Sequence, residues 1–326
     1  MTLTIRRRLL AAAALALTLT GAVWAEPTPF PSKPIRVVVP YTPGGVSDTV
    51  ARLVMQKVGE RLKTPVVVDN QPGANSQIGS SIVARAAPDG YTLLVVVAAH
   101  AINPSLYPKM SYAPLQDLRG VSEFGAIPML LVSSAQLPPK TLPEFVAWAK
   151  AHPQGATYAS SGIGSGAHLT GELLAQTIGV PMTHVPYKGM APALPDLFAG
   201  QVSSVFDSVQ TMMPQVKAGK LYALAITSPQ RWSTAPDVPT MAELGYPGMT
   251  SGSWIGLLAP AKTPKDIVDK ISAETQKVLD TPEMRARLID YGIDPVGGTP
   301  EKFDAFIQSE AKRWAEVVKK AGIRLE

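Results

Sequence analysis

IRVVVPYTPGGVSDTVARLV, residues 35–54, is the stretch that decides the fold class. Its first five residues form a short β-branched run, which is typical of a buried strand, and Pro40 ends that run. Its last part repeats apolar residues at the three-to-four spacing of a helix with one buried face. Ser47 or Asp48 is expected to cap this helix through a side-chain oxygen. A strand, a glycine-containing loop and a helix in this order predict an α/β fold.

The same order of strand, loop and helix recurs along the chain. Such alternation predicts mostly parallel sheets with helices on both faces. The two halves share this architecture but no sequence repeat. Strand-like runs occupy 65–69, 91–98, 157–160, 182–185, 202–206 and 222–226, and helix-like runs occupy 78–87, 168–178, 194–199, 264–279, 282–291 and 300–321.

The N-terminus, residues 1–25, is interpreted as an export signal rather than as part of the fold. Three arginines at 6–8 precede an apolar run, and Val23-Trp24-Ala25 places small residues at both positions that a signal peptidase reads. The apolar run has about 15 residues, whereas a membrane-spanning helix needs about 20. We therefore expect a periplasmic protein with a cleavable signal; an uncleaved membrane anchor is the alternative.

Composition excludes several classes of protein. The chain has no cysteine, which rules out disulfides, thiolate metal sites and a cysteine nucleophile. The formal charge of +5 falls to +2 without the three arginines of the signal, and no basic run remains in the rest of the chain. The sequence therefore lacks the basic footprint of a nucleic-acid-binding protein.

Two glycine-rich loops are the candidate binding site: YTPGGVSD, residues 41–48, and SSGIGSGAH, residues 160–168. Each lies between a buried strand and a helix. Glycine lets backbone N–H groups approach a ligand, and a helix start adds unpaired donors and a positive dipole end. Such a pair of loops can bind an anion without arginine or lysine, at the carboxyl ends of the strands. The alternative is that the glycines only shape tight turns.

The second loop also partly fits two other motifs. Gly162 to Ala167 matches G-x-G-x-x-A, the dinucleotide fingerprint, but the acidic residue expected after the next strand is missing. Ser165 lacks the glycine two residues earlier that a hydrolase elbow requires. We therefore expect no cofactor and no nucleophilic serine.

The histidines and Asp207 allow weaker hypotheses. His168 and Glu172 are four residues apart and could contact one metal ion, but a single pair is a weak signal, so no metal site is predicted. His100 follows a buried strand, where it lines a cleft or supports one from behind. Asp207 ends another strand as a ligand contact or a cap. An enzyme that uses His168 or His100 with Asp207 is the alternative to a binding protein.

In several ordered pieces the chain resembles a known family. It is similar to the extracytoplasmic solute receptors of tripartite tricarboxylate transporters, the TctC-like or Bug receptors, from Pro34 to the C-terminus. The pieces are PYTPGG (40–45) with Asp48 and Arg52, NQPGA (70–74), ARAAPDGYTL (84–93), the second loop, HVPYKG (184–189), FDS (206–208) and PDVPT (236–240).

The resemblance implies a two-lobed type II periplasmic-binding-protein fold with the ligand in the cleft. It places the first lobe at 33–127, the second at 128–252 and the return to the first at 253–326. It also implies that both loops grip one carboxylate of the ligand. The expected contacts are Tyr41, Thr42, Gly44, Gly45, Ser47 and Asp48 in the first loop, Ser161, Gly164, Ser165, Gly166, Ala167 and His168 in the second, and Ala98, His100 and Asp207 at the far end.

The same resemblance implies a monomer that delivers a small carboxylate or dicarboxylate to a large and a small membrane subunit. A receptor that signals to a sensor partner is the alternative. Two departures from relatives concern the ligand's far end: Ala98-Ala99, where relatives often carry a hydroxyl, and Ala74-Asn75-Ser76, where they often have more glycine. The less polar wall makes an aromatic carboxylate one option, and the ligand itself stays open.

Overall fold

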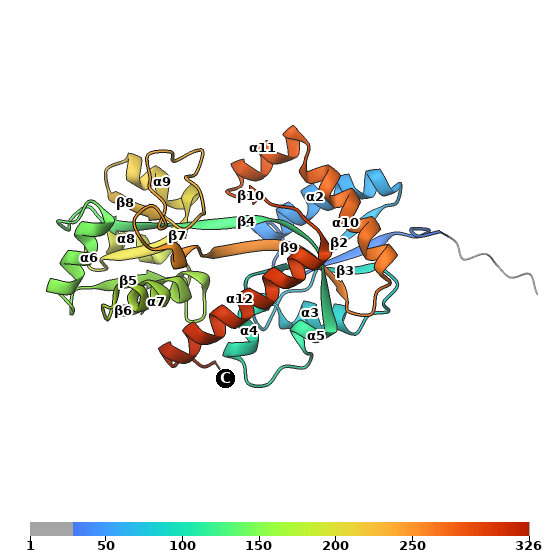
Figure 1. The fold of residues 1–326 in the computed structure, drawn as a ribbon, viewed down its shortest axis with the longest axis horizontal. Helices are drawn as coiled ribbons and strands as arrows, with labels where there is room; N and C mark the ends of the chain where they lie inside the picture. The colour runs from blue at the N-terminus through green and yellow to red at the C-terminus, as the bar shows by residue number, and fades with distance from the viewer. Residues whose placement is uncertain (1–28, 326) are drawn as a thin grey trace, which may run out of the picture. The chain divides into compact units, whose positions relative to one another are not determined.

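A mixed ten-stranded sheet carries the fold of Lys33–Glu326 (Figure 1). The computed structural model describes residues 29–325. The predicted export signal, residues 1–25, lies outside the described residues. Across 29–325, no helix is both long and apolar enough to cross a membrane.

The strands alternate with helices, as the sequence predicts. The strands are β1 Ile35–Val39, β2 Val66–Asn70, β3 Thr92–Val97, β4 Leu118–Ser134, β5 Thr157–Ser160, β6 Thr183–Pro186, β7 Ser204–Ser208, β8 Leu221–Ile226, β9 Gly252–Pro260 and β10 Asp294–Pro295.

The helices vary from single turns to the long C-terminal helix. They are α2 Val46–Leu62, α3 Gln77–Ala84, α4 Ala99–Leu106, α5 Pro114–Asp117, α6 Leu142–Ala151, α7 Gly166–Ile178, α8 Leu194–Phe198, α9 Val209–Lys217, α10 Lys265–Leu279, α11 Pro282–Asp290 and α12 Pro300–Ala321, with 3₁₀ turns η1 Ala191–Ala193 and η2 Pro247–Met249.

The strand β4 is long enough to belong to two groups of strands. From Leu118 to Pro128 it pairs antiparallel with β9, and from Met129 onward it pairs antiparallel with β7 and β8. We call β1, β2, β3, β9 and β10 with the first part of β4 sheet A, and β5 to β8 with its last part sheet B. Parallel pairing joins β1 to β2 and β3 in sheet A and joins β5 to β6 and β7 in sheet B.

The C-terminal part of the chain returns to sheet A. Strand β9 lies between β3 and β4, and α10 packs beside α2 (Figure 1). Helix α12 has strong end signals, because the Thr299 side chain accepts from the N–H of Lys302 and Gly322 adopts φ 67° just after the last turn. Its buried residues follow three-to-four spacing, from Phe303 to Val318, and pack on β4, α4 and α7.

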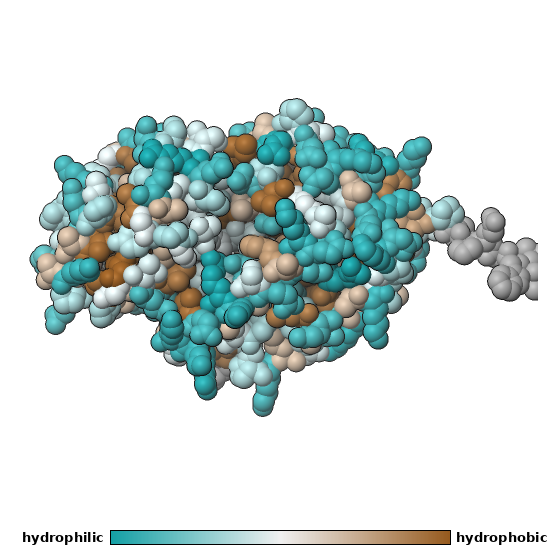
Figure 2. Space-filling model, viewed as in Figure 1, coloured by the Kyte–Doolittle hydropathy of each residue, from teal (hydrophilic) through white to brown (hydrophobic). Residues whose placement is uncertain are grey.

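The hydrophobic core consists of separate clusters for the two sheets. One lies under α12 and joins Trp254 of β9 and Leu106 of α4 to Leu169 of α7. Two more cover the faces of sheet B, around Val205 and around Phe145. Figure 2 shows polar residues over most of the visible face, with hydrophobic residues in small groups, so most of the apolar surface is inside.

Element starts differ from the sequence prediction at three points. Gly45, not Ser47 or Asp48, is the N-cap of α2, and no side chain caps it. Helix α7 starts at Gly166 rather than at His168, and α4 follows β3 after a single residue, Ala98. In α2 and α7 a glycine, which has low helix propensity, lies at the N-cap or at the first helical position, whereas the alanines at the start of α4 favour a helix.

Candidate functional site

The first loop, residues 41–48, is held from behind by a carboxylate. The side chain of Asp48 is buried in the first turn of α2 and accepts from the backbone N–H of Gly44 at 2.9 Å. Arg52 and Asn70 also donate to it, each at 2.9 Å, and Asn70 donates to the carbonyl oxygen of Tyr41. The Asp48 carboxylate therefore has three donors of its own and serves as an anchor for the loop.

These contacts also determine the charge of the anchor. Burial opposes ionisation of Asp48, but the hydrogen bonds from Arg52, Gly44 and Asn70 outweigh it and lower the pKa of the carboxyl group. Ionised Asp48 and Arg52 neutralise each other. The rest of the loop, from Thr42 to Val46, is exposed, while Tyr41 is half-buried and its burial raises its pKa to about 12.

The backbone of loop 1 presents donors to the solvent side. Because α2 begins after Gly45, the N–H groups of Val46, Ser47 and Asp48 have no intrahelical acceptor, and no described residue supplies another. Gly44 has φ 83°, a conformation that favours glycine and turns the chain into this start. Loop 1 therefore has the helix-start donors on which the anion-binding prediction rests.

The second loop, residues 160–168, is held by neutral groups. The ring nitrogen Nδ1 of His168 accepts from the N–H of Gly164 at 3.0 Å, and Ser165 caps α7 by accepting from the N–H of His168. Gly164 has φ 79°. The N–H groups of Gly166 and Ala167 have no hydrogen-bond acceptor among the described residues, so this loop also presents helix-start donors.

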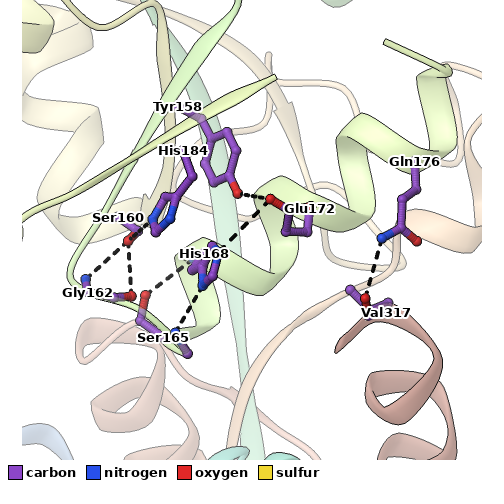
Figure 3. A network of polar contacts seen from close by, with 10 residues as sticks. Tyr158, Ser160, Gly162, Ser165, His168, Glu172, Gln176, His184 and Val317 are labelled. Atoms are coloured by element: carbon purple, nitrogen blue, oxygen red, sulfur yellow. Dashed lines mark hydrogen bonds and ion pairs between the residues drawn. The ribbon is translucent and has the colours of Figure 1, made fainter. Parts of the chain in front are cut away.

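A stack of aromatic rings supports loop 2 (Figure 3). The His168 ring stacks on His184 with centroids 3.7 Å apart, and His184 stacks on Tyr158 at 5.0 Å. Tyr158 donates to Glu172 at 2.5 Å, and His184 Nε2 contacts the Ser160 hydroxyl at 2.6 Å. The network joins β5, β6 and α7 behind the loop.

Burial keeps this stack neutral. It lowers the pKa of His168 to about 4, with a further contribution from His184, and it lowers the pKa of His184 as well. A neutral His168 that accepts at Nδ1 carries its proton on Nε2, which faces the Glu172 carboxylate at 4.0 Å. The sequence places Ser160 in the second loop and Glu172 four residues after His168, but it does not predict that Tyr158 and His184 join them. The HVPYKG motif, which contains His184, was the available signal.

The three far-end residues lie on two elements, with Ala98 and His100 at the start of α4 and Asp207 near the end of β7. Ala98 and His100 are 5% and 4% exposed at the start of α4, and Nδ1 of His100 is buried without a hydrogen-bond partner. Burial lowers the pKa of His100 to about 4. Asp207 ends β7, where its carboxylate accepts from the N–H of Ser208 at 2.6 Å and burial raises its pKa.

No hydrogen bond or ion pair between described residues joins loop 1 to loop 2. Loop 2 instead approaches sheet A's helices, since a Cβ on Gly164 would lie 2.9 Å from Leu106 of α4 and 3.2 Å from Leu325. All fifteen predicted contacts therefore fall into four places: the start of α2, the start of α7, the start of α4 after β3, and the end of β7.

The geometry does not favour the enzyme alternatives. Ser160 and His184 form a hydrogen-bonded pair, but Ser160 has no exposed surface that a substrate could reach. Within residues 29–325, neither His168 nor His100 hydrogen-bonds to Asp207. In the same part of the chain, no group of three or more His, Asp or Glu side chains is placed to hold a metal ion.

Comparison with known proteins identifies the family. The sequence model described as "Tripartite tricarboxylate transporter family receptor" matches residues 50–323. Protein BugT of Bordetella pertussis is 36% identical over 299 residues, which cover 91% of this chain and 92% of BugT.

Two solved structures of Rhodopseudomonas palustris are similar along their whole length. One, solved with adipate, is 34% identical with a TM-score of 0.75 and covers 91% of this chain and 100% of its own. The other, MatC with bound malate, is 37% identical with a TM-score of 0.71 and covers 89% of this chain and 100% of its own. The family consists of solute receptors rather than of a class of enzymes. This chain belongs to the TctC family of tripartite tricarboxylate transporter receptors, and it has their periplasmic-binding-protein fold.

Proposed function

We propose that this protein captures a small carboxylate or dicarboxylate in the periplasm and delivers it to a tripartite tricarboxylate transporter. In this proposal loops 1 and 2 hold one carboxylate group of the ligand. The far end of the ligand lies toward Ala98, His100 and Asp207, and the protein acts as a monomer with no cofactor.

The observation that carries the proposal is the pair of helix starts. Loop 1 presents the N–H groups of Val46, Ser47 and Asp48, and loop 2 presents those of Gly166 and Ala167. Side-chain anchors lie behind both loops, so they fix the backbone without using these donors. Donors of this kind, at the positive ends of two helix dipoles, suit a carboxylate better than a neutral or cationic ligand.

The relatives support the ligand class. Adipate and malate, with which the two R. palustris proteins were solved, are both dicarboxylates. We infer that this chain takes a ligand of the same class, and that its buried Ala98 makes the far end less polar.

We also propose that sheets A and B mark two lobes, 33–127 with 253–326 and 128–252. The change of β4 partners between Pro128 and Met129 supports this boundary, because only a few strands then link the lobes. Closure about these strands would bring loop 1 and loop 2 to the same ligand. Export by a cleavable signal, residues 1–25, and delivery to large and small permease subunits complete the proposal.

The test is titration calorimetry of the protein from residue 26 onward. Malate, adipate and benzoate would be titrated in parallel, with the matching amides as neutral controls. We expect at least one carboxylate to bind and its amide to bind far more weakly. Native mass spectrometry of protein purified without refolding would identify a ligand carried from the cell.

Two results would overturn the proposal. Equal affinity for a carboxylate and its amide would show that the helix-start donors do not select a charged ligand. Chemical turnover of a bound carboxylate, followed by mass spectrometry of the mixture, would show an enzyme instead of a receptor.

A further inference from the structure

A cavity lies where β4, β9 and β10 meet α12. Its volume is about 300 Å³, and none of the fifteen predicted ligand contacts lines it. Residues from both sheets contribute to its wall, because Thr227 follows β8 of sheet B while Trp254 belongs to β9. This position is distinct from the loops at the starts of α2 and α7.

Glu123 of β4 is the unusual group in this wall. It is 7% exposed and lines the cavity, yet its carboxyl group makes no hydrogen bond with any residue in 29–325. The pairing of β4 with β9 is irregular between Glu123 and Gly125. A bulge of this kind re-aims a side chain, and a buried carboxyl group without a partner is costly unless something binds it.

Glu310 of α12 contributes a second carboxylate, in a position that the helix pattern reserves for an apolar residue. It is 7% exposed and accepts from Arg313 at 2.8 Å and from the indole nitrogen of Trp314 at 3.0 Å. Arg313 also donates to the carbonyl oxygen of Thr250. The cavity's arginine is therefore engaged with Glu310 and Thr250 and leaves Glu123 uncompensated.

The balance of charge around the cavity is acidic. Three carboxyl groups, those of Glu123, Asp294 and Glu310, line the cavity with one guanidinium group, that of Arg313. Arg285, which is not in the lining, also acts on Asp294. Burial and the nearby Glu310 charge raise the pKa of Glu123 to about 7, and burial raises that of Asp294. An incoming positive charge would relieve this excess, whereas an anion would add to it.

The rest of the wall combines aromatic and apolar residues, among them Trp254 and Phe306, with several serine and threonine residues. Trp254 is 2% exposed, and its ring meets the edge of Phe306 with centroids 5.6 Å apart. Within residues 29–325, no group of three or more His, Asp or Glu side chains is placed to hold a metal ion. Aromatic rings beside a carboxylate instead suit an organic cation, through contact with the ring faces and an ion pair.

We propose that this cavity binds a small organic ammonium ion, with its ammonium group on the Glu123 carboxylate and its apolar body against Trp254 and Phe306. The site is independent of the carboxylate site proposed above. Because its wall contains β4, the strand that sheets A and B share, a bound ammonium ion would contact the strand about which the proposed lobes would close.

The test uses benzylammonium as the probe, with benzyl alcohol as the neutral control and benzoate as the anionic one. Calorimetry at pH 8 is expected to show binding of benzylammonium alone at this site. Glu123→Gln keeps the shape and removes the charge, so it should weaken binding roughly tenfold or more. Glu316→Gln, an exposed glutamate on the outer side of α12, is the matched control and should leave the affinity unchanged.

Two further measurements locate the effect. Ala126→Leu fills part of the cavity and should also weaken benzylammonium binding, while Gly44→Val in loop 1 should not. Lowering the pH from 8 to 6 should weaken binding by roughly tenfold, because Glu123 takes up a proton when its pKa is near 7. Equal affinity for benzyl alcohol, or unchanged affinity in Glu123→Gln, would overturn the proposal.

Discussion

Loop 1 and loop 2 present the same kind of backbone donors but are anchored by opposite means. An ionised carboxylate, Asp48, holds loop 1 through Arg52, Asn70 and Gly44. A neutral imidazole, His168, holds loop 2 and is kept neutral by burial and by the His184 ring. A buried anchor can therefore hold a helix start in shape either by ionised hydrogen bonds, as Asp48 does, or by a neutral stacked ring, as His168 does.

The largest effect is expected from Gly164→Val in loop 2. Its φ of 79° disfavours any side chain, and the new Cβ would lie 2.9 Å from the buried Leu106. We expect loss of measurable ligand binding and a fall of about 2–4 kcal/mol in the free energy of unfolding. Calorimetry and urea unfolding measure the two effects.

Gly44→Val in loop 1 is the counterpart. Gly44 has φ 83°, but nothing lies within 4 Å of its Cβ position, so only backbone strain of about 1–2 kcal/mol is expected, again with loss of binding. Gly219→Val, at φ 71° and equally open, is the control for strain alone and should bind normally. Wild-type affinity in Gly44→Val would show that loop 1 is only a turn.

Removing the charged anchor should weaken ligand binding less than the two glycine substitutions do. Asp48→Ala leaves the N–H of Gly44, the Arg52 guanidinium and the Asn70 amide without their shared acceptor. We expect a loss of about 1–3 kcal/mol in stability and weaker ligand binding, measured as above. Glu60→Ala, on the same helix but exposed and paired with Lys57, is the control. If the two variants behaved alike, the anchoring role of Asp48 would be wrong.

The neutral anchor of loop 2, His168, should make the stability of the protein depend on pH. The folded-state pKa of His168 is about 4, below its unfolded value of about 6.5, so the unfolded chain binds more protons between these values. The stability that neutral His168 contributes is therefore fully present above about pH 6.5 and is lost as the pH falls toward 4. His168→Asn keeps an acceptor for the N–H of Gly164 but does not titrate.

We expect the wild type to lose about 1–2 kcal/mol more than His168→Asn between pH 7 and pH 5. Urea unfolding at the two pH values measures the difference. His100, with a similar pKa, titrates equally in both proteins and cancels in the comparison. An equal fall in the free energy of unfolding of the wild type and His168→Asn from pH 7 to pH 5 would mean that His168 becomes protonated in the folded protein as well.

The smallest effect is expected from the helix cap of loop 2. Ser165→Ala and Thr281→Ala each remove a cap that accepts an N–H at 3.3 Å, at the starts of α7 and α11. Both should cost about 1 kcal/mol in thermal unfolding. Ser165→Ala alone should weaken ligand binding, because only α7 starts at the proposed site. Equal ligand affinity in the two variants would show that the Ser165 cap has no effect on ligand binding.

Both loops were predictable from the sequence because their signals are local. A β-branched run, a glycine turn and a helical period define residues 35–54 without reference to the rest of the chain. The family membership and the fold class were predicted in the same way, from ordered motifs such as HVPYKG, and the comparisons confirm them.

The supports of the loops were not predictable, because they join distant residues. Tyr158, His184 and Glu172 meet only when β5, β6 and α7 pack together. The cap of α2 was predicted at Ser47 or Asp48, but Asp48 instead turns back to Gly44, which leaves Gly45 as the cap. The placement of the fifteen ligand contacts stays a prediction.

Strand β9 determines the order in which this fold can be completed. The ribosome delivers the chain from its N-terminus, yet Leu94 of β3 pairs with Leu258 of β9, and β4 joins that group only on the other side of β9. Until β9 has been synthesised, β3 keeps an open edge, which is prone to pair with other chains. Sheet B contains its own strands in one continuous stretch with β4 and can form earlier. A nascent chain halted before residue 252 would therefore aggregate through sheet A rather than persist as a weakened receptor.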